Sequence, residues 1–269
     1  ARTWDDDLLT ALIGKYPPVL ANQLYRRYQS VFPDTYKGHY RPADAVNDIG
    51  WLETQRPDAP LAVEVIPAEG RAARFKLLQW HQQLSLSRVM PILESFGMKV
   101  LNEHAYALLL QDSCLWLHDF RTEMPDSLPR EQLAQSLSCV REAMQLLWRG
   151  EAETDVFNRL VTLVPCRWRE AALFRAISAW LKQAGFPLSA AAQAEALGRH
   201  PQAARLLLDL FHARFEPGAN GNRSARQQEV LDRLLPVLEA VDGLTDDRIL
   251  RQYLNVIQAM QRTSYFQPE

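Results

Sequence analysis

The chain has 269 residues, 47% of them hydrophobic and 23% charged, and its formal net charge is −2 at pH 7. This composition predicts a globular protein with a substantial core, and it excludes the strongly basic surface that is typical of nucleic-acid-binding proteins. No apolar run approaches the roughly 20 residues that span a bilayer, and the N-terminus shows no secretory signal. We therefore expect neither nucleic acid nor a membrane among its partners.

The cysteines indicate a reducing environment. Cys114, Cys139 and Cys166 are odd in number, widely spaced and outside any Cys-x-x-Cys pattern. They therefore indicate neither a disulfide framework nor a zinc site. Free thiols are typical of the cytoplasm, and we expect the protein to be located there.

The first 42 residues are predicted to form a helical module, residues 1–42. Pro17 and Pro18 separate two stretches that have apolar residues at helical spacing. The apolar residues are Trp4, Leu8, Leu9, Leu12 and Ile13 before the prolines, and Leu20, Leu24, Tyr25 and Tyr28 after them. Residues 33–42 are aromatic and rich in turn-forming residues, which predicts a connection.

Residues 43–125 are predicted to form an α+β module. It opens with a helix over residues 43–52, and alternation of apolar and polar residues then predicts four strands. The strands lie at residues 61–65, 75–77, 98–110 and 114–120, with a turn at Glu69 and Gly70 between the first two. A helix lies between the second and third strands, where Pro91 is tolerated only near the first turn and Gly97 is the stop. This order is close to a split β-α-β ferredoxin-like unit, but no strand can be placed ahead of the first helix.

The polar, proline-bearing stretch Thr122–Pro129 is predicted to end the sheet, and residues 126–269 are predicted to be all helical. The fold class is therefore α+β: N-terminal helices, an antiparallel sheet with helices, then a helical module. An apolar stripe over residues 133–147 ends at Gly150, and Pro201 opens another helix.

Two later helices carry specific predictions. Pro236 is predicted to kink the helix over residues 230–241. Thr245 is predicted to cap the last helix, which places Asp246 and Asp247 near the positive end of its dipole. The loop before these helices, residues 216–224, is rich in Gly and Asn.

The helix that ends at Gly185 is predicted to turn Trp180 toward the core and Ser178 toward the polar face. Trp180 forms, with Trp148 and Trp168, a candidate stacking platform, but tryptophans at helical spacing more often belong to the core.

No catalytic, cofactor-binding or metal-binding residue is assigned from the sequence. The 11 glycines include no Gly-x-Gly-x-x-Gly turn, which a dinucleotide fold needs because only glycine lets the backbone approach the pyrophosphate. A phosphate loop, a Gly-x-Ser-x-Gly elbow and a metal-spaced His pair are also absent. His104 and His118, on two predicted strands, are a candidate facing pair, although alternating strand residues are the more common case.

Three acidic residues, Glu151, Glu153 and Asp155, are a candidate acid/base cluster. Acidic residues beside a helix N-terminus, where they interact favourably with the dipole, are the more common case.

Three stretches resemble a known family. The first comprises Trp148-Arg149-Gly150-x-Ala152-Glu153-x-Asp155-x-Phe157-Asn158-Arg159-Leu160-Val161, Trp168-Arg169 and Arg214-Phe215-Glu216-Pro217. The second comprises Leu84-Ser85-Leu86-Ser87-x-x-x-Pro91-x-Leu93-Glu94-x-x-Gly97-Met98-x-Val100 and Asp119-Phe120, and the third comprises Asp247-Arg248-Ile249-Leu250-Arg251 and Arg262-Thr263-Ser264-x-Phe266-Gln267. In this order they resemble the large bacterial NAD-specific glutamate dehydrogenases, whose chains are several times longer. The first residue, Ala1, agrees with an internal fragment and equally with N-terminal processing.

The resemblance implies that the chain is the non-catalytic region ahead of the dehydrogenase domain. It implies that residues 43–125 are an ACT-like regulatory module and that residues 126–269 lead to the catalytic domain. The family reaction is oxidative deamination of L-glutamate to 2-oxoglutarate with NAD, and the residues that perform it belong to a domain outside this sequence. The implied partners are the rest of the same polypeptide, further copies in a homo-oligomer and an amino-acid effector. The alternative is a free-standing amino-acid-sensing or scaffold protein without enzymatic activity.

Overall fold

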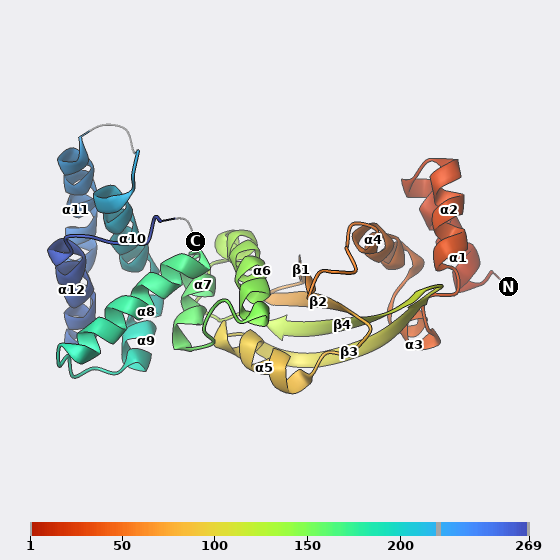
Figure 1. The fold of residues 1–269 in the computed structure, drawn as a ribbon, viewed down its shortest axis with the longest axis horizontal. Coiled ribbons are helices and arrows are strands. Elements are labelled where there is room, and N and C mark those ends of the chain that lie inside the picture. The colour runs from red at the N-terminus through yellow and green to blue at the C-terminus, as the bar shows by residue number, and fades with distance from the viewer. Residues whose placement is uncertain (1, 219–221, 268–269) are drawn as a thin grey trace. The chain divides into compact units, whose positions relative to one another are not determined.

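The computed structural model describes residues 2–218 and 222–267 (Figure 1). The chain divides into two compact units, each assembled from three segments. Unit 1 consists of Ala1–Pro91, Lys99–Glu123 and Met144–Glu151, and unit 2 consists of Ile92–Met98, Met124–Ala143 and Ala152–Glu269. The division into modules 1–42, 43–125 and 126–269 stays a prediction.

Unit 1 opens with four helices. They are α1 (Trp4–Lys15), α2 (Pro18–Tyr28), α3 (Asp34–His39) and α4 (Pro42–Leu52). Thr3 caps α1 in a capping box with Asp6, which satisfies two backbone donors that have no partner inside the helix. The prediction of a connection over residues 33–42 is wrong, because α3 lies within it. This helix has only six residues, which is too short for the periodicity of its side chains to show in the sequence.

The four strands form one antiparallel sheet, as predicted. They are β1 (Ala62–Pro67), β2 (Ala72–Trp80), β3 (Lys99–Leu110) and β4 (Ser113–Glu123), in the order β1-β2-β4-β3. β4 pairs antiparallel with both β2 and β3, so those two strands run parallel to each other with β4 between them. The crossover from β2 to β3 is α5 (Leu86–Ser95), and this is the split β-α-β arrangement. The outer place beside β2 is taken by β1.

The helix α5 differs from the prediction at Pro91. This residue lies inside the helix and not in its first turn, so the carbonyl of Ser87 has no N–H partner four residues on. Both Pro91 and Ser87 are exposed, and water can therefore satisfy that carbonyl. Gly97 follows the helix with a φ of 79°, a left-handed conformation that glycine adopts without steric cost.

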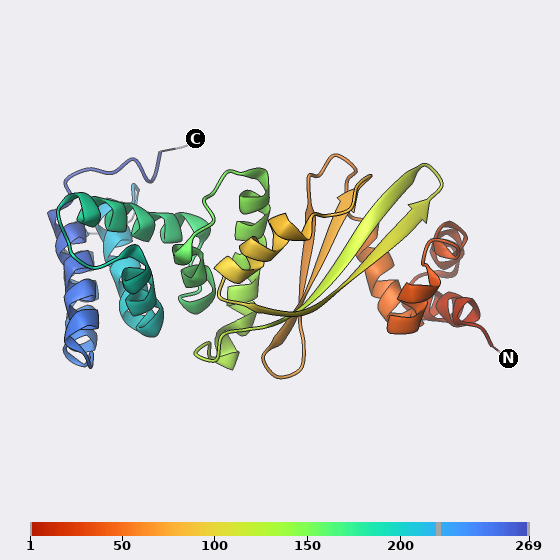
Figure 2. The same ribbon diagram turned by 90° about the horizontal axis from the view of Figure 1, so that it is seen from below.

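Helices α1–α4 pack against one end of the sheet in a common core (Figure 2). The sheet contributes one face to it, through Leu78, Trp80, Tyr106, Leu108, Leu115 and Leu117. The helices contribute a stack of aromatic rings, in which Tyr36 lies 4.5 Å from Phe32 and 4.4 Å from Tyr40 between ring centroids. Tyr106 of the sheet meets Tyr36 edge-on at 5.3 Å, an arrangement that aromatic pairs favour.

All secondary-structure elements in the described residues of unit 2 are helices. After the short η1 (Arg130–Gln132), α6 (Leu133–Arg149) runs from unit 2 into unit 1. The remaining elements are η2 (Val156–Asn158), α7 (Arg159–Leu163), α8 (Trp168–Gln183), α9 (Ala190–Arg199), α10 (Pro201–Phe215), α11 (Arg223–Glu239) and α12 (Leu244–Ala259). In the described part of the chain, no helix is both long and apolar enough to cross a membrane.

Two predictions about these helices are wrong. In α8 the buried face includes Ser178 and Leu181, whereas Trp180 is 53% exposed, because the packed face is rotated relative to the stripe of largest apolar residues. Thr245 lies inside α12, whose N-cap is Gly243 with a φ of 111°. Asp246 and Asp247 do lie in the first turn, as predicted. The kink at Pro236 stays a prediction.

Candidate functional site

The polar residues of the first stretch that resembles the family, around Asp155 and Asn158, form a local hydrogen-bond network. Asp155 caps η2 by accepting the N–H of Phe157 at 2.9 Å, which confirms its helix-end role. Arg175 on α8 binds both oxygens of Asp155 and also Asn158 Oδ1, at 3.0 Å. Asn158 in turn donates to the carbonyl of Glu153 at 3.1 Å. This cluster therefore holds the backbone around η2, with both carboxylate oxygens of Asp155 bound to Arg175.

Of the other two acidic residues of that candidate cluster, Glu153 lies 3.7 Å from Arg175 Nε, whereas Glu151 lies apart. Glu151 binds Arg149 through two contacts of 2.8 Å and 2.9 Å, and both side chains are exposed. The three carboxylates therefore do not converge on one point as acid/base catalysis requires.

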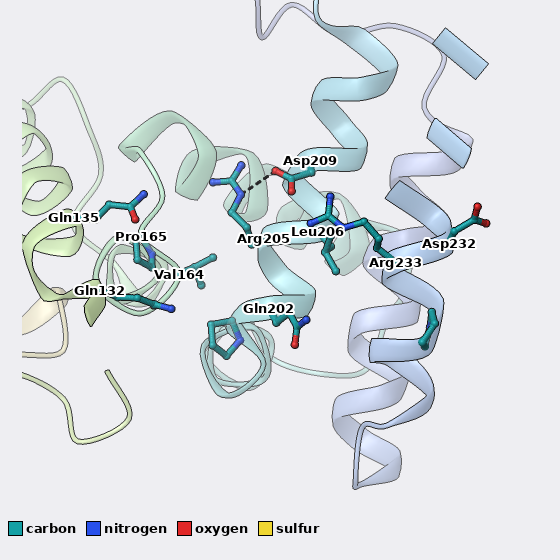
Figure 3. A pocket seen from close by; sticks show the side chains of 12 residues that line it. Gln132, Gln135, Val164, Pro165, Gln202, Arg205, Leu206, Asp209, Asp232 and Arg233 are labelled. Atoms are coloured by element: carbon teal, nitrogen blue, oxygen red, sulfur yellow. Dashed lines mark hydrogen bonds and ion pairs between the residues drawn. The ribbon is translucent and has the colours of Figure 1, made fainter. Parts of the chain in front are cut away.

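Unit 2 has a hollow of about 550 Å³ beside Arg205 on α10. Figure 3 shows Gln135 and Pro165 on one side of it and Arg233 of α11 on the other. The Arg205 guanidinium is bound by Asp209 at 3.0 Å and by Glu170 at 2.8 Å. The guanidinium at the centre of this hollow is therefore already paired with two carboxylates.

Glu170 is the buried centre of that network. It accepts hydrogen bonds from Arg205, from His212 at 3.2 Å and from the backbone N–H of Arg167 at 2.9 Å. Burial alone would raise the pKa of the Glu170 carboxyl, but these bonds outweigh it and lower the pKa to about 2. Glu170 is therefore ionised at neutral pH, and its role is to join α8 to α10.

Another pocket, the sheet-face pocket, lies on the sheet of unit 1. Its volume is about 380 Å³, and the residues used below are Tyr40, Arg74, Asn102, His104, Asp119 and Arg121. The strand register explains their grouping, because Arg74 pairs with Arg121, Arg121 with Asn102, and His104 with Asp119. Directly paired residues on neighbouring strands project from the same face. The pocket thus collects polar side chains from three strands.

The floor of the sheet-face pocket is a buried ion pair. Asp119 is only 4% exposed and is bound by the guanidinium of Arg74. Burial raises the pKa of the Asp119 carboxyl, whereas the neighbouring guanidinium favours its ionised form. Arg74 also donates to the Tyr40 hydroxyl and lies 5.0 Å from the centroid of its ring. Tyr40 therefore links the floor of the pocket to the N-terminal helices.

The two histidines singled out by the sequence do not face each other. His104 pairs with Asp119, so His118 lies on the opposite face of the sheet. The prediction that His104 and His118 face each other is wrong, because successive side chains of a strand point to opposite faces of the sheet. His118 Nε2 accepts the N–H of Leu84 at 3.2 Å, which places its proton on Nδ1, where it is donated to Glu103 at 2.7 Å. Burial lowers the pKa of His118, and the bond that Nε2 accepts from Leu84 requires the neutral imidazole.

His104 has a different histidine neighbour. The ring of His39, on α3, lies 4.3 Å away between centroids, and His39 Nδ1 is 2.7 Å from the Tyr106 hydroxyl. Within residues 2–218 and 222–267, no group of three or more His, Cys, Asp or Glu side chains is arranged to hold a metal ion.

Comparison with known proteins assigns these elements to one family. Three family models match: "Glutamate dehydrogenase, helical motif 2" over residues 11–54, "Glutamate dehydrogenase, ACT3 domain" over residues 61–135, and "Glutamate dehydrogenase, helical motif 3" over residues 152–217. Over 99% of its length the chain is 36% identical to the NAD-specific glutamate dehydrogenase of Halomonas elongata. The chain belongs to the NAD-specific glutamate dehydrogenase family. The resemblance of the three sequence stretches is thereby confirmed.

Two further glutamate dehydrogenases of this family are similar over almost the whole chain. The Mycobacterium tuberculosis protein is 31% identical over 99% of it, and the Pseudomonas aeruginosa protein is 32% identical over 100% of it. The chain spans 17% of the length of each relative. The sheet-face pocket draws Tyr40 from the stretch matched by helical motif 2 and its strand residues from the stretch matched by the ACT3 domain.

Proposed function

We propose that this chain is a non-catalytic, regulatory and assembly part of an NAD-dependent glutamate dehydrogenase, which converts L-glutamate to 2-oxoglutarate with NAD as hydride acceptor. The observation that carries the proposal is that every matched family model describes a helical motif or an ACT domain of such an enzyme. The relatives named as dehydrogenases are also far longer than the chain, which spans 17% of each. On this proposal the chemistry and the NAD site belong to other parts of a longer polypeptide.

The purified chain is expected to show no glutamate-dependent NAD reduction and no change in tryptophan fluorescence on addition of NAD. Hydride transfer needs a nucleotide held against the substrate, and that positioning supplies much of the rate. The measurement is absorbance of reduced NAD, with a relative of full length as the positive control. Saturable NAD binding by the chain alone would contradict the proposal and direct attention to residues 217–224, of which 219–221 lie outside the described residues.

The proposed partner of unit 2 is another part of the same polypeptide. α8 and α12 form a groove of about 330 Å³ lined only by apolar residues, among them Leu173, Trp180, Val256 and Met260. A large exposed apolar side chain in such a groove is typical of an interaction surface. Because the relatives contain much more chain than this one does, we propose that a segment of the longer polypeptide covers Trp180, in a protein that assembles further as a homo-oligomer in the cytoplasm.

Hydroxyl-radical footprinting tests this contact. Trp180 is 53% exposed in the chain, and it is expected to be oxidised readily in the isolated chain but strongly protected in the full-length protein. Trp148, which is 5% exposed, is the internal control and should be protected in both. Equal oxidation of Trp180 in the two proteins would show that nothing covers the groove.

A further inference from the structure

We propose that the sheet-face pocket binds a small molecule through its carboxylate, which Arg121 and Asn102 hold. The proposal deepens the regulatory role and rests on that proposed function for its biological meaning. It differs from ligand binding between copies of an ACT domain, because the pocket lies within one chain, between α3 and the sheet.

Two side chains of the pocket are available to bind a ligand. Among the residues that the structure describes, neither Arg121 nor Asn102 makes a side-chain hydrogen bond or ion pair, although both line the pocket. They are direct partners on β4 and β3, so a guanidinium and an amide project from the same face. A guanidinium presents paired N–H donors that match the two oxygens of a carboxylate.

The charges that line the pocket favour an anionic ligand. The pocket is lined by two basic side chains, Arg74 and Arg121, and by two acidic side chains, Asp119 and Glu69. The Arg74 guanidinium is committed to Asp119 and Tyr40. Arg121 is therefore the cation that remains available, and it favours one anionic group on the ligand.

The size and lining of the pocket suit a small molecule. Its volume of about 380 Å³ exceeds that of a single metabolite of amino-acid size and lies within the range of small-molecule sites. The imidazole of His104 stands beside Arg121 on the same face and supplies a further polar contact. A bound carboxylate would thus have donors on two strands and a planar ring at its side.

The pocket is also coupled to the core of unit 1. The Tyr40 ring, which contacts Arg74, lies 4.9 Å from Lys76 Nζ and stacks on Tyr36. Tyr36 in turn donates its hydroxyl to the buried Asp48 at 2.5 Å. A ligand that shifts the pocket floor therefore acts on the helices of the stretch matched by helical motif 2, which gives the site a physical route to a regulatory effect.

Calorimetric titration of the 269-residue chain tests the proposal. The probes are L-glutamate, L-aspartate and 2-oxoglutarate, with inorganic phosphate and methylamine as controls for anion and amine. We expect saturable binding of at least one carboxylate, and comparison of amino acids with 2-oxoglutarate shows whether an ammonium group contributes. Absence of binding by all three carboxylates, or phosphate binding of equal strength, would overturn the proposal.

A variant pair locates the site. Arg121→Ala is expected to weaken carboxylate binding at least about tenfold, as loss of a charge-assisted hydrogen bond does, with an unchanged unfolding temperature because Arg121 is exposed. Arg141→Ala removes an exposed positive charge from α6 that does not line the pocket, and it should leave binding unchanged. Equal affinity in Arg121→Ala and the unmodified chain would place the ligand elsewhere. Because no NAD is present, these outcomes are independent of the dehydrogenase assignment, which NAD turnover tests.

Discussion

Replacing Asp48 by Asn is expected to lower the free energy of unfolding of unit 1 by about 3–5 kcal/mol. Asp48 and Lys76 form an ion pair whose side chains are only 2% and 3% exposed. Asn keeps the side-chain volume but leaves the Lys76 ammonium buried without a counter-charge, and such a charge is costly in a medium of low polarity.

Hydrogen exchange of peptides from α4 and β2, measured in increasing urea, would report this loss. The double variant Asp48→Asn with Lys76→Met is the matched control, because it removes both charges and should recover much of the lost stability. If the single variant exchanges as slowly as the unmodified chain, the pair contributes nothing and the buried charges are compensated in another way.

Unit 2 is expected to lose stability in acid through Glu170. The pKa of this carboxyl is lowered from its ordinary value of 4.5 to about 2 in the folded chain, so the folded state favours the ionised form. The stabilisation is complete above about pH 4.5 and is lost as the pH falls toward 2, because protonation then releases Arg205 and His212. The shift corresponds to about 3 kcal/mol at neutral pH.

Urea unfolding of the chain at several pH values between 6 and 3 would measure this dependence. Glu170→Gln lacks the ionisable group, so it should be less stable than the unmodified chain at pH 6 and should approach it at pH 3. Glu151→Gln is the control, because Glu151 is exposed and should change the profile little. A constant difference between Glu170→Gln and the unmodified chain across this range would contradict the role of ionisation.

The local elements of the fold are well predicted from the sequence, because their signals are local. Alternation of apolar residues locates the four strands, and Gly97, Gly150 and Gly185 end helices with positive φ as expected. Failures occur where tertiary packing decides. The six residues of α3 are held by the aromatic stack around Tyr36, and the buried face of α8 is chosen by its neighbours, which leaves Trp180 exposed.

The sheet-face pocket could not be predicted from local periodicity, because it depends on the order of the strands in the sheet. The pairs Arg74 with Lys76 and Asp119 with Arg121 appear as polar residues at alternating positions, and alternation predicts that the members of each pair share a face. It does not predict that β4 lies between β2 and β3, which brings Asn102 opposite Arg121. Strand order depends on long-range pairing, and so does the site.

The chain passes from one unit to the other several times, and this limits how the protein can be divided into fragments. The chain alternates between them through six segments, so no single cut yields both units intact. A piece ending at Glu123 would lack Met144–Glu151, whose Trp148 ring lies 3.9 Å below the Arg88 guanidinium within unit 1. A chimera of two relatives with one junction inside this region would therefore combine segments of the same unit from different proteins. A functional chimera should either have junctions at several points or take the whole region from one relative.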